Sequence, residues 1–287
     1  MNHLSIREQA VAELSSLAPK NHVKGFLHTK EAARNTPREF ECETHGVFKT
    51  KFSEIGSGKI MINATCSKCI DEHEDLINKK ESELMRKQND AKKQKEAEER
   101  AGKLKSRGVG KRYLDNSFEN FKVDTPGKKN ALLRARDVCE RITSKDNPTN
   151  LIMVGGVGTG KTHLANSMII YLTDNGYSCG RINLIDMVRA LKATWNKDSE
   201  LTEACVLATY SECDLLIVDE VGVQFNSDTE KMFIFDVINS RYEEELPTVI
   251  ISNLDVSGVK EIIGERCVDR LREDGGKVVA FDWGSYR

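Results

Sequence analysis

The sequence predicts an α/β fold, a parallel sheet flanked by helices, preceded by a small separate module and a long charged helix. Three observations lead to this prediction. Four short apolar segments of strand length alternate with segments of helical periodicity in the second half of the chain. A glycine-rich loop directly follows the first of these segments. Near the N-terminus, cysteines and a histidine recur at short spacings, and a charged stretch without proline comes after them.

Composition limits the class of protein. The 287 residues suffice for two domains, and 43 Lys+Arg against 45 Asp+Glu give a formal net charge of -2. No global basic field therefore attracts nucleic acid, and any such contact must come from local patches. No apolar run approaches the about 20 residues of a membrane span, and residues 1–8 lack a hydrophobic signal region. We expect a cytoplasmic protein, in which clustered thiols indicate metal more often than disulfide.

Residues 1–39 are expected to form an N-terminal helical segment. Ile6, Ala10, Leu14 and Leu17 lie on one helical face, which is typical of a short amphipathic helix. This face fits a helix packed on its neighbour and a partner-binding helix equally well.

Residues 40–70 contain a pattern that predicts a structural zinc site. Cys42 and His45 form one x2 pair, and Cys66 and Cys69 form the second. Three thiolates and one imidazole are the ligand set of a closed tetrahedral zinc site, which leaves no open position for catalysis. His73 is a possible substitute ligand, and four unrelated residues are the alternative interpretation.

The segments 47–52 and 59–63 alternate in polarity like the two strands of a hairpin. Together with the metal ligands, they indicate a zinc-ribbon-like module.

Residues 71–107 are expected to form a charged helical arm. Ile70, Ile77, Leu84 and Ala91 recur every seven residues, but charged or polar residues occupy the partner heptad position. A coiled coil needs apolar residues at both heptad positions, and only one is apolar here. The pattern therefore favours a single solvated helix, stabilised by Glu–Lys pairs, over a coiled coil. The arm could join two modules, dock on a partner's helices or contact nucleic acid, and its charge alone does not distinguish these three roles.

The segment 155–162 reads G-x-x-x-x-G-K-T, the phosphate-binding loop of nucleotide hydrolases. An apolar strand at 150–154 precedes it and a helical segment at 163–172 follows, as this loop requires. Backbone N–H groups and the helix N-terminus would hold the phosphates, while Lys161 reaches the β- and γ-phosphates and Thr162 holds Mg²⁺. The expected nucleotide ligands are Gly155, Gly156, Val157, Gly158, Thr159, Gly160, Lys161, Thr162 and His163. The sequence therefore predicts an ATP or GTP site.

Three further strands are expected at 177–184, 214–220 and 248–253, with helices at 130–142 and 185–196. The strand at 214–220 ends in two carboxylates, of which Asp219 would hold the Mg²⁺ shell and Glu220 would activate the attacking water. Asn253 ends another strand, where it would position water or sense the γ-phosphate.

A helix at 265–272 carries Arg266 and Arg270 on one face. A guanidinium beside the γ-phosphate stabilises charge in the transition state, and a neighbouring subunit can supply it. Surface salt bridging is the alternative role for these arginines.

Residues from about 113 to 287 resemble the DnaC family of bacterial replicative-helicase loaders, which are AAA+ ATPases. The segments that carry the resemblance are Asn116–Phe121, Gly158–Ala165, Leu215–Gln224, Ser252–Asn253, Gly264–Arg270 and Phe281–Arg287. The resemblance implies an AAA+ domain at 108–287 that binds ATP and Mg²⁺, with Asn253 as first sensor and Arg270 as a finger acting in trans. Arg266 would be an accessory of the same motif.

The resemblance also implies the partners. They are a hexameric replicative helicase of the DnaB type, single-stranded DNA, and further copies of the chain in a ring or spiral. We expect DNA contacts on the helix at 185–196, where Arg189, Lys192 and Trp195 offer charge and stacking. The zinc module and arm depart from the simplest family members, although related Gram-positive and phage loaders carry zinc-binding N-terminal domains; a phage or prophage origin is plausible.

Three other functions compete with this interpretation. The nearest is an IstB-like ATPase that regulates transposition by assembling on DNA. A small-molecule kinase would need a substrate lid, which the sequence lacks. A zinc-dependent DNA-binding module with a degenerate ATPase is disfavoured by the intact Lys161, Thr162 and Asp219.

Overall fold

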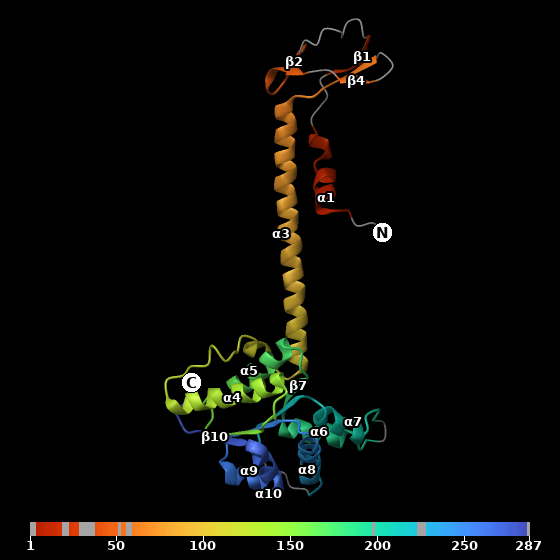
Figure 1. Cartoon of the computed structure of the whole chain (residues 1–287). Coiled ribbons are helices and arrows are strands. Elements are labelled where there is room, and N and C mark those ends of the chain that lie inside the picture. The colour runs from red at the N-terminus through yellow and green to blue at the C-terminus, as the bar shows by residue number, and fades with distance from the viewer. Residues whose placement is uncertain are drawn as a thin grey trace. The chain divides into compact units, whose positions relative to one another are not determined.

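The computed structural model describes residues 4–18, 23–28, 38–50, 53–55, 59–196, 199–222 and 228–285. The chain divides into two compact units, Met1–Glu96 and Ala97–Arg287 (Figure 1). Several residues of the predicted motifs lie outside the described part, namely Lys51, Phe52, Val223, Gln224, Tyr286 and Arg287. None of the described helices combines the length and apolarity needed to cross a membrane.

The second unit is built on a five-stranded sheet whose paired strands are all parallel, in the order β10-β6-β9-β8-β7. The strands are β6 (Leu151–Gly155), β7 (Cys179–Asn183), β8 (Leu215–Asp219), β9 (Thr248–Ser252) and β10 (Lys277–Phe281). The four predicted strands are confirmed. β10 was not predicted, because its apolar run Val278–Phe281 is only four residues long, and a run this short does not distinguish a strand from a helix.

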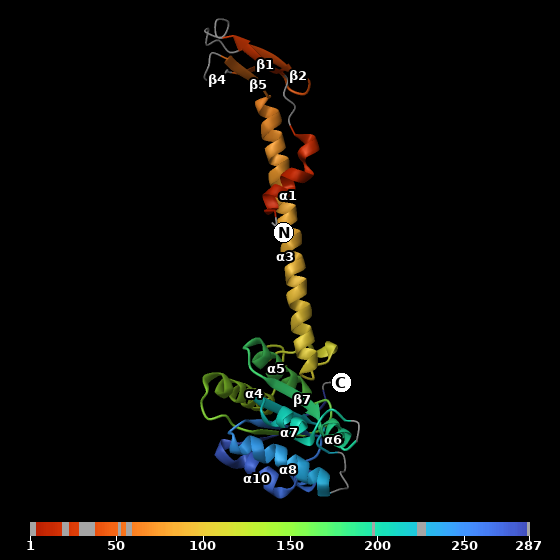
Figure 2. The same ribbon diagram turned by 90° about the vertical axis from the view of Figure 1, so that its right-hand side faces the viewer.

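Helices cover both faces of this sheet (Figure 2). On one face lie α4 (Pro126–Ser144) and α5 (Lys161–Asp174). On the other face lie α6 (Leu184–Ala193), α7 (Glu203–Ser211), α8 (Asp228–Glu243), α9 (Val256–Ile263) and α10 (Glu265–Arg272). The short 3-10 turns η2 (Lys111–Tyr113) and η3 (Glu273–Gly275) belong to this unit. The predicted helices are confirmed, with ends shifted by a few residues, and the fold class is α/β as predicted.

The first unit contains two small antiparallel sheets. Its elements are α1 (Ile6–Glu13), η1 (Ser15–Leu17), β1 (Val23–His28), β2 (Arg38–Cys42), β3 (Gly46–Thr50), β4 (Ser53–Ile55), β5 (Lys59–Ala64) and the first part of α3 (Ser67–Ser106). The pairing expected between segments 47–52 and 59–63 is wrong. β3 pairs with β2, and β5 lies between β1 and β4. Alternating polarity indicates a strand but does not choose its partner.

The segment 1–39, expected to be helical, also contains β1 and the start of β2. Its helix α1 is present and packs on α3, as both views show (Figures 1 and 2). The Lys80 Nζ lies 2.9 Å from a Glu13 carboxylate oxygen, and Ile77 of α3 is only 4% exposed. Helix α1 of the same chain thus covers part of the apolar stripe of α3 that includes Ile77.

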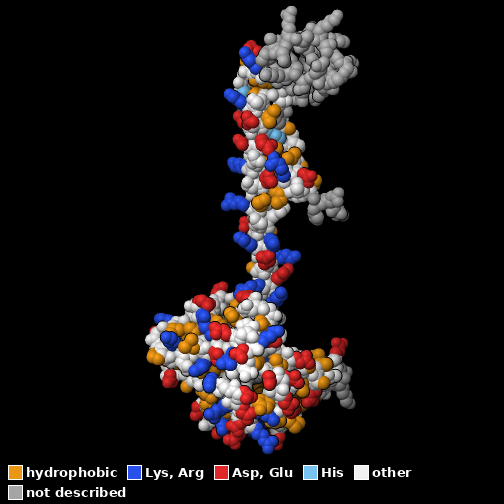
Figure 3. All heavy atoms as spheres, in the orientation of Figure 1, with side chains coloured by type: hydrophobic (Ala, Val, Ile, Leu, Met, Phe, Trp, Pro, Cys, Tyr) orange, Lys and Arg blue, Asp and Glu red, His pale blue; other side chains and the backbone are white. Residues whose placement is uncertain are grey.

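Beyond α1, α3 is a solvated helix. All residues from 85 to 100 are exposed, and acidic and basic side chains are interspersed along it (Figure 3). Lys87 pairs with Glu83 at 2.8 Å, one of the i,i+4 pairs that stabilise such a helix by a few tenths of a kcal/mol, about 0.2–0.5 each.

The C-terminal part of α3 belongs to the second unit. Leu104 is fully buried in the core beneath α4 and α5, and Arg100 binds the Asp174 carboxylate through two hydrogen bonds of 2.8 and 2.7 Å. The structure therefore divides the chain at Glu96, within α3, and not at residue 107 where the charged composition ends.

Candidate nucleotide site and metal cluster

The glycine-rich loop joins β6 to α5 at the carboxyl edge of the sheet. Gly155 has φ 130°, and a Cβ there would lie 2.3 Å from the carbonyl oxygen of Phe281, so only glycine fits. Gly158 and Gly160 also have positive φ, 77° and 101°. These conformations wrap the loop around the N-terminus of α5, the arrangement that binds phosphate through backbone N–H groups.

Lys161 is 5% exposed and lies at the floor of this loop. Its Nζ donates to the carbonyl oxygens of Gly155 at 2.5 Å and Gly156 at 2.7 Å. Burial lowers the pKa of Lys161, and the Asp219 carboxylate opposes this effect. The ammonium group is thus held inside the loop, within reach of a phosphate chain.

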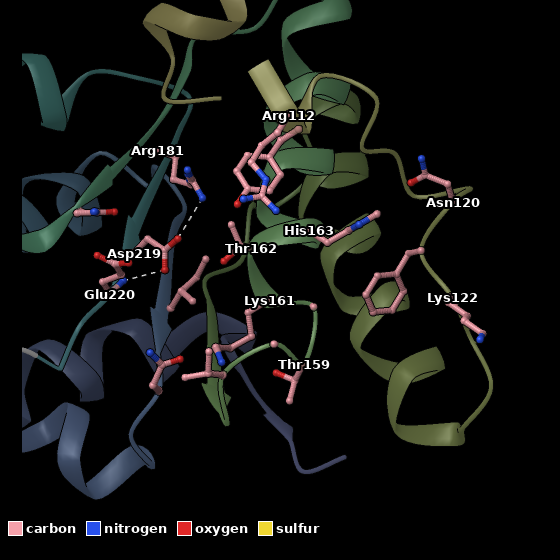
Figure 4. A pocket seen from close by; sticks show the side chains of 18 residues that line it. Arg112, Asn120, Lys122, Thr159, Lys161, Thr162, His163, Arg181, Asp219 and Glu220 are labelled. Atoms are coloured by element: carbon pink, nitrogen blue, oxygen red, sulfur yellow. Dashed lines mark hydrogen bonds and ion pairs between the residues drawn. The ribbon is translucent and has the colours of Figure 1, made fainter. Parts of the chain in front are cut away.

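A cavity of about 660 Å³ opens above the loop (Figure 4). Its lining includes every predicted site residue from Val157 to His163, together with Asp219, Glu220 and Asn253. Gly155 and Gly156 form the start of the loop and do not line the cavity. The structure therefore brings together residues from three strand ends and one helix N-terminus, as expected for a parallel sheet.

The Asp219 carboxylate is anchored on both of its oxygens. Oδ1 accepts a hydrogen bond from the backbone N–H of Glu220 at 2.7 Å, and Oδ2 accepts one from Arg181 Nη1 at 3.2 Å (Figure 4). Burial raises the pKa of Asp219 above its ordinary value, against the lowering effects of the Glu220 N–H and of Arg181. A cation placed beside this buried carboxylate would be strongly favoured.

Glu220 has φ 57°, a left-handed conformation that is uncommon for a residue with a side chain. It turns the chain at the end of β8 and leaves Glu220 exposed at the cavity wall. The next strand is tied to the same turn, because Ser252 Oγ donates to the carbonyl oxygen of Val221. Asn253 follows Ser252 and is exposed to the cavity.

Several cavity residues were not found by sequence reasoning. They are Arg112, Tyr113, Asn120, Lys122, Arg181 and Asn183. Asn183 could have been found, since it ends the predicted strand 177–184 as Asp219 ends its own strand, and the two are in register. Phe118 and Phe121 are both 5% exposed and pack in the core, and Phe121 also contributes to the cavity wall.

Arg270 does not line the cavity. Its guanidinium carbon lies 4.9 Å from the ring centroid of Phe235 and 5.3 Å from that of Tyr242, both on α8. Within the described residues its Nη1 is buried without a hydrogen-bond partner. Arg266 is exposed on the same helix.

The expected DNA-contacting residues all lie on or just after α6. Arg189 pairs with Asp186 at 2.9 Å, and Lys192 pairs at 2.6 Å with Glu230, whose side chain is only 9% exposed. Trp195 is 53% exposed. The two cations are therefore partly neutralised by neighbouring carboxylates.

The four predicted zinc ligands converge in the first unit. The ligand atoms of Cys42, His45, Cys66 and Cys69 all lie within 4.8 Å of one another, and the turn between β2 and β3 and the start of α3 supply them. His45 Nδ1 lies 3.2 to 3.7 Å from the three sulfurs, and the Cys42 and Cys69 sulfurs are 3.6 Å apart. Tetrahedral zinc with ordinary bond lengths has edges of about 3.6 to 3.8 Å. Three of these four separations lie in that range, and the fourth, from His45 Nδ1 to the Cys69 sulfur, is shorter.

Glu72, one turn into α3, completes the cluster and was not predicted. Its carboxylate lies 2.9 Å from His45 Nε2, which leaves Nδ1 to face the sulfurs. Burial acts to raise the pKa of Cys42, but the backbone N–H groups of His45 and Thr44 prevail and lower it to about 6. His73 instead lies 3.3 Å from the Leu14 carbonyl oxygen, away from the cluster.

Known proteins are similar to this chain over more than half of its length. The family described as IstB-like ATP binding protein matches residues 73–283. The replicative helicase loader DnaC of Escherichia coli (strain K12) is 35% identical over 180 residues, 63% of this chain and 72% of the loader. The loader DnaC of Buchnera aphidicola subsp. Schizaphis graminum has the same identity and coverage. A crystal structure of the DnaC helicase loader superposes with a TM-score of 0.52 at 22% identity, covering 60% of this chain and 99% of that one, and therefore shares its fold.

Proposed function

Because the chain belongs to the family of IstB-like ATP-binding proteins, we propose that it is an ATP-dependent loader of a hexameric replicative DNA helicase. It would bind the helicase and help deposit it on single-stranded DNA when replication begins. The observation that carries the enzymatic part is the cavity in which the phosphate loop, two adjacent carboxylates and a strand-end amide converge. Relatives named replicative helicase loader, at 35% identity, favour a replicative helicase as the partner that is loaded.

The side chains have distinct roles in ATP hydrolysis. Lys161 would leave the loop carbonyls for the β- and γ-phosphates, while Thr162 and Asp219 would hold the Mg²⁺ that neutralises phosphate charge. The exposed Glu220 would orient and deprotonate water, and Asn253 would fix that water or the γ-phosphate. The oxygen donors and the buried carboxylate fit the oxygen ligands that Mg²⁺ prefers.

Arg270 is proposed to act in trans, on the nucleotide of a neighbouring copy in a ring or spiral. Its position supports this role in two ways: it is absent from the cavity of its own chain, and its buried Nη1 has no hydrogen-bond partner among the described residues. Arg266, exposed one turn earlier, would assist at the same contact.

The first unit is proposed to hold a structural zinc ion and to dock on the helicase. Four ligands close the coordination sphere, so the ion would stabilise the fold and not take part in hydrolysis. α1 and the first part of α3 pack on each other next to the cluster, and this packed surface would dock on the helicase without further folding.

The test is native mass analysis of the full chain mixed with a DnaB-type helicase, with and without ATP. We expect a discrete complex that a variant lacking residues 1–96 does not form. This deletion ends where the second unit begins, whereas a deletion to residue 107 would remove the buried Leu104. Absence of any complex from a sample that binds ATP normally would contradict the loader function.

The family description also supports a second candidate, a transposition-type ATPase that assembles on DNA. It would form ATP-dependent assemblies on double-stranded DNA and stimulate a transposase, with no need for a helicase. Adding duplex DNA without helicase to the same mass analysis separates the two: large DNA-bound assemblies favour this candidate.

A further inference from the structure

Arg181, on β7, contacts two other parts of the second unit, the end of β8 and the segment that follows α3. Its Nη1 donates to Asp219 Oδ2 at 3.2 Å, and its Nη2 donates to the carbonyl oxygen of Gly108 at 3.1 Å. Its backbone N–H donates to the carbonyl oxygen of Arg107 at 2.9 Å. The residue therefore joins the edge of β7 and the carboxylate of the nucleotide site to the chain that leaves α3.

The segment Leu104–Val109, which we call the arm root, is built for this contact. Leu104 and Val109 are buried, at 0% and 1% exposure, and the Val109 N–H donates to the Leu104 carbonyl oxygen at 3.0 Å. Gly108 has φ 88°, and a Cβ there would lie 2.1 Å from the carbonyl oxygen of Arg181. The backbone of the arm root and that of β7 are thus as close as glycine allows.

Arg107 fixes the other side of the arm root. Its Nη1 donates to Thr173 Oγ1 at 2.6 Å and to the Tyr177 carbonyl oxygen at 2.7 Å, at the end of α5. α5 begins at Lys161 of the phosphate loop, so the arm root touches both elements that lead to the nucleotide site.

We propose that Arg181 is a positioning residue that couples the metal-binding state of Asp219 to the arm root. With Asp219 free, both arms of the guanidinium are used, one on the carboxylate and one on Gly108. A divalent cation near Asp219 repels the guanidinium, whose side chain is only 15% exposed and little screened by water. Arg181 then leaves Asp219, and its hold on Gly108 weakens. This inference rests on the proposed ATP–Mg²⁺ site.

Hydrogen exchange measured by mass spectrometry on the full chain tests the coupling. Peptides covering 104–110 and 179–183 are followed without nucleotide, with ATP and EDTA, and with saturating Mg–ATP. We expect exchange in both peptides to become at least about threefold faster with Mg–ATP, and to stay near the nucleotide-free rate with ATP and EDTA.

Two variants separate the bridge from general destabilisation. Arg181→Lys keeps the positive charge, but one ammonium replaces the planar fork that spans Asp219 and Gly108. Arg181→Gln removes the charge. In both variants, fast exchange in the 104–110 peptide is expected under all three conditions, so the response to Mg–ATP is lost.

Arg141→Ala is the matched control. Arg141 also binds one aspartate, Asp137 at 3.1 Å, and one backbone carbonyl, that of Asn147 at 3.2 Å, but it does not line the cavity. This variant is expected to respond like the wild type.

Two results would overturn the coupling: unchanged or slower exchange in a wild-type chain that binds Mg–ATP, or a preserved response in Arg181→Lys. ATP binding is measured in the same samples with a fluorescent analogue. If the wild type bound no ATP, both the proposed function and the coupling would be wrong. If it bound Mg–ATP without faster exchange, only the coupling would be wrong.

Discussion

The indole Nε1 of Trp283 donates a hydrogen bond to the carbonyl oxygen of Thr159, at 2.9 Å, across 124 residues of sequence. The centroids of the Trp283 and Phe281 rings are 4.8 Å apart. The backbone of Gly127, on α4, lies against the Trp283 ring. Trp283 therefore supports the phosphate loop from a strand end that lies far away in the sequence.

Replacing Trp283 by phenylalanine should weaken ATP binding. The substitution keeps most of the ring packing and removes only the hydrogen bond to Thr159, which is typically worth about 1 kcal/mol, or roughly fivefold in affinity. Titration with a fluorescent ATP analogue measures this effect, and thermal unfolding shows whether the fold is retained. Trp283→Ala should lose more, and equal affinity in all three proteins would show that the loop needs no such support.

Arg270→Ala should bind ATP but hydrolyse it at least about tenfold more slowly, because an arginine acting in trans stabilises only transition-state charge. Mixing this variant with Lys161→Ala should restore part of the turnover, since each variant supplies what the other lacks. Phosphate release measures the rate. Arg272→Ala, an exposed arginine of the same helix, is the control and should keep wild-type turnover.

Failure of rescue at every mixing ratio would count against a shared site. Arg270 also packs on Phe235 and Tyr242, so the thermal midpoint of each variant must accompany the rates.

Glu72→Gln should weaken zinc binding by about tenfold, since a carboxylate on the outer nitrogen of a ligating histidine orients the ring and raises its basicity. Competition with a chromophoric chelator measures the affinity. Asp75→Asn, an exposed acid one turn further along α3, is the control. Equal affinities in Glu72→Gln and the wild type would leave Glu72 without a role at the metal.

Removal of zinc should open residues 42–69 to protease and leave ATP binding intact, because the cluster and the nucleotide cavity lie in different compact units. Limited proteolysis with and without chelator, followed by an ATP titration, checks both parts. Loss of ATP binding on chelation would contradict this separation.

Single-stranded DNA affinity should fall when Trp195 is replaced by alanine, by roughly 1–3 kcal/mol if a base stacks on this exposed ring. Arg189→Ala should add a smaller, salt-dependent loss, because Asp186 already neutralises part of its charge. Lys192→Ala is less informative alone, since it takes away the partner of the largely buried Glu230 carboxylate. Fluorescence anisotropy at two salt concentrations measures these changes, and unchanged affinity in Trp195→Ala and Arg189→Ala would refute the DNA assignment.

Sequence reasoning predicted much of the second unit, because its signals are local. Continuous apolar segments such as β6 and β8 predicted buried parallel strands, and the phosphate loop and the acids after β8 follow those strands directly. The same reasoning missed β10, whose apolar run of four residues is too short to identify a strand, and it mispaired β3, because alternating polarity does not specify which strand is the partner.

By itself, the sequence determined the fold class, the nucleotide-binding loop, the two carboxylates at the end of β8, and the three cysteines and one histidine of the first unit. Each of these is a pattern within a few residues, or a set of residue types with one shared chemistry. Only the tertiary structure decided that Arg181 reaches both Asp219 and Gly108, that Glu72 faces His45, and that Arg270 lies outside its own cavity. These contacts depend on strand order, helix packing and side-chain direction, which arise from the whole packed unit and leave no local mark in the sequence.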